Sequence, residues 1–139
     1  MNRKREVRDL LFRTEMERKR RIQPIWNDMG LIAGQPRVLS ELTLKGHMTQ
    51  RELSDACCIE PATLSRALDR LEERGYIVRN DNPGCRRSFL ITLTEKGQKS
   101  AENVQKEFEI LEEQMMEGLS EGELELLAGL IGKIYHNLQ

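Results

Sequence analysis

Two segments of this 139-residue sequence have the residue types and spacing that suit binding to a polyanion. In PATLSRALDR (61–70) short side chains precede two arginines, and in CRR (85–87) two arginines follow Pro83 and Gly84. Short side chains at the start of a helix let its backbone approach a nucleic-acid groove, where arginines behind them reach bases or phosphates. Cations at the tip of a hairpin suit phosphates or a narrow minor groove.

The remaining chemistry-bearing residues do not form a catalytic or metal-binding pattern. His47 and His136 are the two histidines, and neither stands near a set of residues that resembles a catalytic triad. The three cysteines and two histidines lack CxxC or HxxxH spacing, and no glycine-rich loop follows a strand. The sequence therefore favours a binding protein without cofactor or metal over an enzyme.

Composition sets the class of protein. The chain is 38% hydrophobic and 32% charged, which is typical of one globular domain, here 1–139. No apolar run approaches the roughly 18 residues of a membrane helix, and the N-terminus lacks the apolar core of a signal peptide. Three cysteines, an odd number, argue against a disulfide framework. We expect a cytoplasmic protein with no membrane partner.

The net charge of −1 hides an uneven distribution. Residues 3–21 hold nine basic and four acidic side chains, and residues 61–87 hold six basic and four acidic. Residues 95–125 hold three basic and ten acidic. A dimer of such chains would present a basic surface to a polyanion while its acidic helices face water. The alternative is that these charges belong to ordinary solvated helix faces.

The first half of the chain predicts short helices. A helix is expected over 3–22, with PIWNDMG (24–30) as a separate short turn, because a proline is poorly tolerated inside a helix. A second helix is expected over 35–45. TQRE (49–52) matches a capping box, which opens a third helix with a buried stripe of Leu53, Ala56 and Cys57.

The second half begins with the clearest helical pattern. Over 61–75, apolar residues at i, i+3, i+4 and i+7 predict one buried stripe that ends at a glycine: Leu64, Ala67, Leu68, Leu71 and Gly75. A hairpin follows, in which Phe89, Ile91 and Leu93 alternate as in a half-buried strand. An acidic helix is expected over 95–117. A second capping box, 120–123, opens a final helix whose apolar stripe is Leu124, Leu127, Ala128, Ile131, Tyr135 and Leu138.

Three short helices followed by a hairpin form the order of a winged helix-turn-helix. The expected fold is mainly α with a small β-hairpin wing, an α+β class, with further helices on either side. In this arrangement 61–75 is the recognition helix and 85–87 the tip of the wing. A capped amphipathic helix and a surface hairpin without a ligand is the alternative.

The sequence resembles the MarR family of bacterial transcriptional regulators. The resemblance rests on RVLSEL, TQRELSDA, ATLSRALDRLEERGYIVR and RRSFLITLTEKG, which lie in the family's order and spacing. It implies a homodimer, with 1–30 and 95–139 as dimerisation helices and 31–94 as the DNA-binding lobe. It further implies a repressor on a pseudo-palindromic operator in double-stranded DNA, released by a small apolar or phenolic effector or by thiol oxidation.

The resemblance also implies individual DNA contacts. Thr63, Ser65 and Arg66 match recognition-helix positions that face the groove, whereas Arg70 matches a phosphate or scaffold contact. Arg87 matches the arginine of the family's wing motif Asp-x-Arg, but Cys85 replaces the aspartate that would orient it; Asp81 is a possible substitute. The full expected set is Thr49, Gln50, Ala62, Thr63, Ser65, Arg66, Arg70, Arg86 and Arg87.

Two further sites follow less directly. Cys85, next to two cations that would lower its pKa, is a candidate redox sensor, whereas Cys57 is expected to be a buried hydrophobe. By analogy with the family, an effector pocket would use Phe12, Met16, Trp26 and Met29, with Leu31 beside them; the alternative is that they are plain core. A dimeric interaction module that has lost operator binding is a third functional reading.

Overall fold

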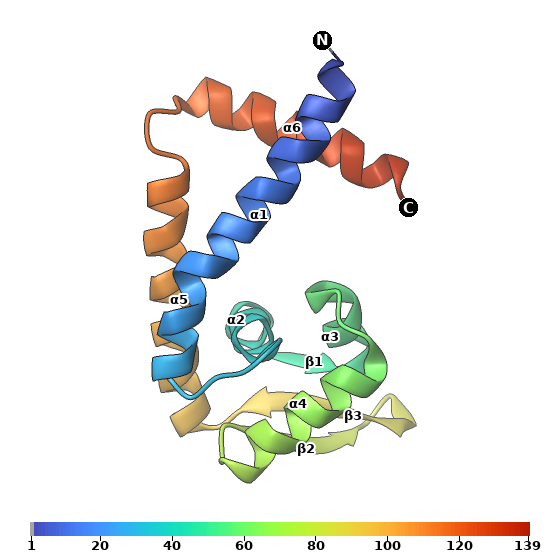
Figure 1. The fold of residues 1–139 in the computed structure, drawn as a ribbon. Helices are drawn as coiled ribbons and strands as arrows, with labels where there is room; N and C mark the ends of the chain where they lie inside the picture. Colours follow the sequence, from blue (N-terminus) through green and yellow to red (C-terminus); the bar gives the residue numbers. More distant parts are fainter. Residues whose placement is uncertain (1) are drawn as a thin grey trace. The chain divides into compact units, whose positions relative to one another are not determined.

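The computed structural model describes residues 2–139, apart from the side chains of Arg86 and Arg87. These residues divide into two compact units, Met1–Phe108 and Glu109–Gln139, and each unit is described by itself. Along the described chain the elements are α1 (Arg3–Asp28), α2 (Gln35–Lys45), β1 (His47–Thr49), α3 (Gln50–Cys57), α4 (Pro61–Glu73), β2 (Ile77–Asn82), β3 (Cys85–Leu93), α5 (Glu95–Met115) and α6 (Glu121–Asn137) (Figure 1). Within this part of the chain, no helix is both long and apolar enough to cross a membrane.

Helix α1 is longer than the sequence predicts, because Pro24 lies inside it. The prediction of a separate turn over 24–30 was therefore wrong. Proline removes one backbone donor and crowds the preceding turn, but Ile22 and Trp26 on either side of it are buried and hold this stretch against the core. The helix ends at Asp28, and Gly30 follows its C-cap with a φ of +71°, which glycine readily adopts.

The helix-turn-helix is built on one apolar core. Fully buried side chains come from α2, α3 and α4 and from the segment before α2: Leu31, Val38, Leu39, Leu42, Leu53, Leu64, Leu68 and Leu71. The predicted capping box of α3 is confirmed, since Thr49 Oγ1 accepts from Glu52 N at 3.1 Å and Glu52 Oε1 accepts from Thr49 N at 3.2 Å. The predicted stripe of α4 is confirmed as well, and it fixes which face of α4 is left for a ligand.

The sheet has three antiparallel strands in the order β1-β3-β2. The hairpin β2–β3 was predicted, but β1 was not, because three residues in front of a capping box carry no strand pattern of their own. Ile91 is fully buried at the centre of β3, whereas Phe89 is 51% exposed. The prediction that Phe89 shares the buried face of the strand was therefore wrong: it pairs with Asp81 toward the tip of the hairpin, where the register shifts.

The second unit contains the end of α5 and the whole of α6. The predicted capping box of α6 is confirmed, with Ser120 Oγ accepting from Glu123 N at 3.1 Å. No residue of α6 is buried. Leu124 of its predicted apolar stripe is half-buried, and the large side chains that follow it on the stripe are exposed, from 37% at Leu127 to 83% at Leu138. Helix α6 thus carries an apolar face that the described chain leaves uncovered.

Candidate nucleic-acid interface

Helix α4 turns a polar face to solvent. Its buried stripe faces the core, so the predicted contact residues lie on the opposite side: Ala62, Thr63, Arg66 and Arg70 are exposed, and Ser65 is half-buried. Pro61 starts the helix, where its missing N–H costs no helical hydrogen bond. Among the residues that the structure describes, neither Arg66 nor Arg70 has an ion-pair partner. Both guanidinium groups are therefore available to a phosphate or a base edge.

Two of the three acids of α4 pair with an arginine of another element. Arg79 on β2 donates from Nη1 to Asp69 Oδ1 at 3.0 Å and to Glu72 Oε1 at 3.2 Å. These exposed pairs add little stability. They do offset two negative charges beside the polar face of α4, so that the local field there is set by the arginines. Sequence reasoning missed Arg79, because its two partners lie seven and ten positions earlier on another element.

The start of α3 lies next to the start of α4. A shallow cavity of about 410 Å³ is lined by Gln50, Arg51, Ser54, Asp55 and Pro61. It brings the predicted contact Gln50 beside the first residue of α4. Thr49 uses its hydroxyl to cap α3, which leaves that oxygen less available to a ligand. Arg51, exposed at the rim, is a cation that the predicted set omitted.

The wing is a tight hairpin closed by Pro83 and Gly84. Asn82 organises the turn: its Oδ1 accepts from Gly84 N at 3.1 Å, and its Nδ2 donates to Ser88 Oγ at 2.9 Å. Cys85 is exposed, as predicted. The predicted contacts of Arg86 and Arg87 depend on side chains that lie outside the described residues.

The cysteines of the helix-turn-helix differ in exposure. Cys57 is half-buried, and this burial raises the pKa of its thiol to about 11, with the charge of Glu41 acting in the same direction. The thiol is therefore protonated at neutral pH and weakly reactive. Cys58 is exposed at the end of α3, with a φ of +53°. The burial and the raised pKa of Cys57 argue that any thiol chemistry of this chain starts at another cysteine.

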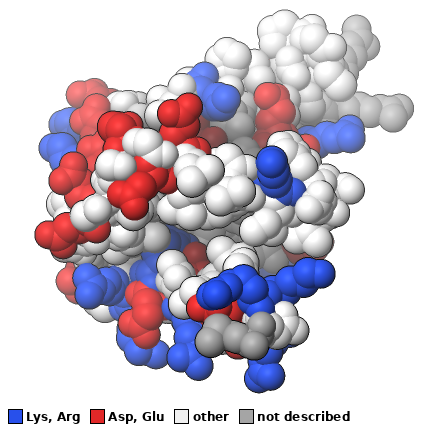
Figure 2. Space-filling view, turned by 90° about the horizontal axis from the view of Figure 1, so that it is seen from above, with Lys and Arg blue, Asp and Glu red and all other residues white. Residues whose placement is uncertain are grey.

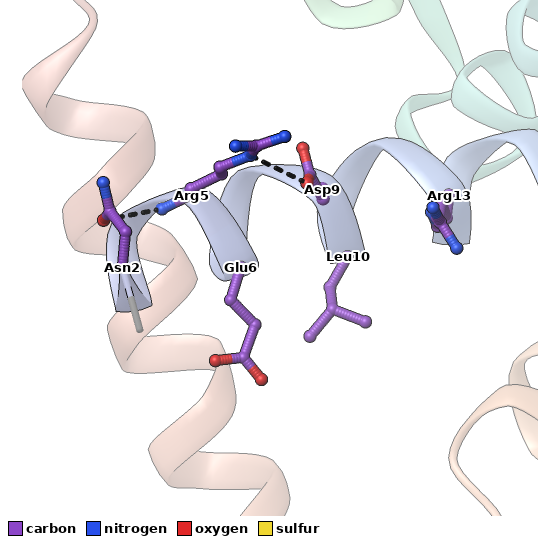
Figure 3. Close-up of a pocket in the computed structure, with 6 residues that line it drawn as sticks. All are labelled: Asn2, Arg5, Glu6, Asp9, Leu10 and Arg13. Atoms are coloured by element: carbon purple, nitrogen blue, oxygen red, sulfur yellow. Dashed lines mark hydrogen bonds and ion pairs between the residues drawn. The ribbon is translucent and has the colours of Figure 1, made fainter.

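The predicted effector residues are spread over different environments. Trp26 is buried and meets Phe108 edge-on at 5.1 Å between ring centroids, whereas Met29 is half-buried. Phe12 and Met16 are 64% and 38% exposed. A cavity of about 450 Å³ lies on the first turns of α1, but its lining residues are others: Asn2, Arg5, Glu6, Asp9, Leu10 and Arg13 (Figure 3). All six come from one helix or its cap, so this hollow is an open surface groove.

Charge of the two signs is unevenly distributed over the surface. In the face drawn in Figure 2, Lys and Arg side chains gather along the lower part, with fewer acids among them. The described residues hold no group of three or more His, Cys, Asp or Glu side chains that could bind a metal.

Comparison with known proteins finds a family whose model matches part of this chain and solved structures with a similar fold. Residues 32–89 match the model of the MarR family. A MarR-family transcriptional regulator of Listeria monocytogenes, solved with a 26mer DNA, is 25% identical, with a match over 95% of this chain and 87% of that one and a TM-score of 0.86. The reduced form of MarR from E. coli is 26% identical over 91% of this chain and 93% of that one, with a TM-score of 0.72.

A third solved structure, NadR in complex with 4-hydroxyphenylacetate, is 24% identical over 92% of this chain and 91% of that one, with a TM-score of 0.81. Over residues 32–89 the chain therefore matches the MarR family, and the resemblance seen in the sequence is confirmed. Members of this family regulate transcription and are not enzymes.

Proposed function

We propose that this protein is a sequence-specific double-stranded DNA-binding regulator, a repressor that acts as a homodimer on a pseudo-palindromic operator. The observation that carries the proposal is the polar face of α4. Arg66 and Arg70 stand there without an ion-pair partner in the described chain, behind short side chains and on a helix fixed by a fully buried stripe. This is the arrangement that major-groove reading requires.

A dimer would present two copies of the polar face of α4 to the same DNA duplex. Two lobes related by a two-fold axis bind half-sites about one helical turn apart, which is why an operator mirrors the symmetry of its protein. The exposed apolar faces of α1 (Val7, Leu10, Leu11, Phe12) and α6 supply surface for such an assembly. The DNA complex of the Listeria relative supports the DNA-binding part of this proposal.

The deciding experiment is an electrophoretic mobility shift and footprint on DNA upstream of the chain's own gene. A protected, two-fold symmetric site with a steep salt dependence would support a repressor. No preference over random DNA would favour an interaction module that has lost operator binding. Adding phenolic acids and fatty-acyl compounds tests release by an effector, and the ligand of NadR makes 4-hydroxyphenylacetate the first compound to try.

Because Cys85 is exposed, it is the candidate for an alternative mechanism in which oxidation of a thiol releases the protein from DNA. The same mobility shift, repeated with hydrogen peroxide, separates this alternative from control by an effector. Release that persists in a Cys85→Ser variant would remove Cys85 as the sensor.

Replacing Arg66 by alanine should weaken operator binding by roughly 1–3 kcal/mol if the side chain reads a base edge, and should relax specificity at one position. If Arg66 contacts a phosphate, binding should fall equally on operator and random DNA, with a shallower salt slope. Fluorescence anisotropy at several salt concentrations measures both. Arg37→Ala is the matched control, since Arg37 is an exposed arginine on α2 that pairs with Glu41. Unchanged binding to both DNAs would remove Arg66 from the interface.

The double change Arg86→Ala, Arg87→Ala should weaken binding to all duplexes, because wing-tip cations meet phosphates irrespective of sequence. The free energy of unfolding should stay within about 0.5 kcal/mol of wild type, because the sequence predicts that both residues lie at the tip of a surface hairpin. Parallel anisotropy and urea titrations test this separation. Binding that falls on the operator alone would instead indicate that the wing reads sequence-dependent groove shape.

A further inference from the structure

Helices α1 and α4 end in the same backbone motif. In α1, Leu31 N donates to Trp26 O at 2.9 Å and Gly30 N to Asn27 O at 3.0 Å. In α4, Tyr76 N donates to Leu71 O at 2.9 Å and Gly75 N to Glu72 O at 3.0 Å. Each pair of bonds is a Schellman motif around a glycine with positive φ. The two hydrogen bonds of each motif hold the backbone at the helix end. A bond between the two ends therefore fixes the position of one helix end relative to the other.

Arg74 makes that bond. Its Nη1 donates to the carbonyl of Gly30 at the end of α1, 44 positions away in the sequence. Its Nη2 donates to the hydroxyl of Tyr76 at 3.0 Å, and its Cζ lies 4.8 Å from the centroid of that ring. Tyr76 is buried, so the ring that supports the guanidinium is itself held in place.

The first turn of α5 is attached to the same point. Lys96 Nζ donates to the carbonyl of Arg74 at 2.7 Å and lies 4.8 Å from the Tyr76 ring centroid. Thr94 N donates to Tyr76 O at 3.0 Å, and Thr94 Oγ1 bonds the carbonyl of Gly75 at 2.5 Å. We call the cluster of Arg74, Tyr76 and Lys96 the joint, because it connects the ends of α1 and α4 with the start of α5.

The joint affects the orientation of the α4 axis more than it affects the packing of α4 on the core. The middle of α4 is already held by its buried stripe and by a long bond from Gln35 Nε2 to Ala67 O at 3.5 Å. Arg74 fixes the C-terminal end, so it opposes rotation of the helix about its packed middle. Half of this 13-residue helix is about 10 Å long, and a tilt of about 10° would move its N-terminal end by about 2 Å.

We propose that Arg74 is a positioning residue that fixes the half-site spacing of the operator. The inference rests on the proposed function: if α1 and α5 contribute to the base of a dimer, the joint sets the angle between that base and each recognition helix. Opposite displacements of about 2 Å in two protomers would change the separation of the reading ends by roughly the 3.4 Å rise of one base pair. Spacing, rather than base identity, is therefore the property that Arg74 controls.

The test uses Arg74→Met, which keeps an apolar stem of similar length and removes all donors. Affinity is measured on operators in which single base pairs are inserted or removed between the half-sites. Wild type should prefer its natural spacing by about tenfold or more, within the usual effect of altering a site. Arg74→Met should reduce this preference to about threefold or less, while it retains wild-type preference against base changes within a half-site.

Lys99→Met is the matched control, because Lys99 is an exposed cation near the start of α5 with no polar partner in the described chain. It should keep the wild-type spacing profile. Tyr76→Phe removes one acceptor of Arg74 but keeps the ring, so its profile should lie between those of wild type and Arg74→Met. An Arg74→Met protein that loses affinity by the same factor at every spacing, or that keeps the wild-type profile, would overturn the inference.

A second measurement needs no DNA and so separates this inference from the proposed function. In the unbound full-length protein, Arg74→Met should accelerate amide hydrogen exchange at Gly30 and Leu31 as well as at Gly75 and Tyr76. Exchange on α2 should stay unchanged. Faster exchange confined to Gly75 and Tyr76 would show that Arg74 does not connect α4 to α1. Failure of the wild-type protein to bind DNA would count against the proposed function alone.

Discussion

Replacing Gly97 by alanine should destabilise the protein by roughly 1–3 kcal/mol or more, the usual range for inserting an atom into a packed site. A Cβ at this position would lie 1.8 Å from Tyr76 O and 2.8 Å from Tyr76 C. These are backbone atoms of a buried residue, so no side-chain rotation can relieve the overlap. The start of α5 would have to move away from β2.

Such a movement would break specific bonds. Thr94 N bonds to Tyr76 O at 3.0 Å, and Gly97 N donates to Thr94 Oγ1 at 3.0 Å, which caps the first turn of α5. Urea denaturation followed by circular dichroism measures the loss as a lower midpoint at unchanged slope. The same variant should show weaker operator binding, since the joint lies beside Gly97.

Gly122→Ala is the matched control for Gly97→Ala. Gly122 also lies in the first turn of a helix, but a Cβ there would meet only Ser120 Oγ, at 3.9 Å. Alanine should therefore be neutral or stabilising by up to about 1 kcal/mol, because it favours the helix over the unfolded chain. Equal stability of the Gly97→Ala protein and wild type would show that the first turn of α5 is not packed this closely against Tyr76.

Local pattern was enough to predict the elements that carry the candidate interface. The stripe from Leu64 to Leu71 repeats at helical spacing, so it determined both the helix and the face that remains for a ligand. The two capping boxes rest on side chains three positions apart, and both are formed. In each case the interacting residues are near neighbours in the sequence, and their physical effect depends on spacing alone.

Features that depend on distant partners were not predicted. Pro24 stays helical because tertiary burial of Ile22 and Trp26 outweighs the local cost of proline. Strand β1 exists because β3 lies beside it: Met48 pairs with Ile91 across 43 positions. The bond from Arg74 to Gly30 and the ion pairs of Arg79 likewise join different elements. No single-sequence spacing rule encodes such contacts.

The distribution of ion pairs sharpens the electrostatic part of the proposal. Within α1, basic and acidic side chains of the same helix pair with each other, as Arg18 does with Glu15 and Arg20 with Glu17. On α4 the situation is reversed, because Arg79 of β2 pairs with Asp69 and Glu72 while Arg66 and Arg70 have no acid partner in the described chain. The excess positive charge of residues 3–21 is thus a poor guide to the interface. Arginines without an ion-pair partner in the described chain identify it better than the net charge of a segment does.

The double change Leu127→Glu, Ile131→Glu should convert the protein from dimer to monomer. Both residues lie on the predicted stripe of α6, and they are 37% and 42% exposed in the single chain. A dimer that covers this stripe and the exposed apolar residues of α1 would bury more than roughly 2,000 Å² in total, the range of obligate dimers. Two-fold symmetry would place four new carboxylates in that interface, where removing unpaired charges from water costs several kcal/mol.

Light scattering at micromolar concentration measures the outcome. Wild type should show twice the 16.1 kDa of one chain, and the double variant should show one chain or aggregate. Lys133→Glu, a charge reversal on the same helix outside the predicted stripe, should remain dimeric. The monomeric variant should also lose high-affinity operator binding, because a single lobe reads one half-site. A wild-type mass of one chain would contradict the proposed dimer, and with it the reason that α6 exposes so much apolar surface.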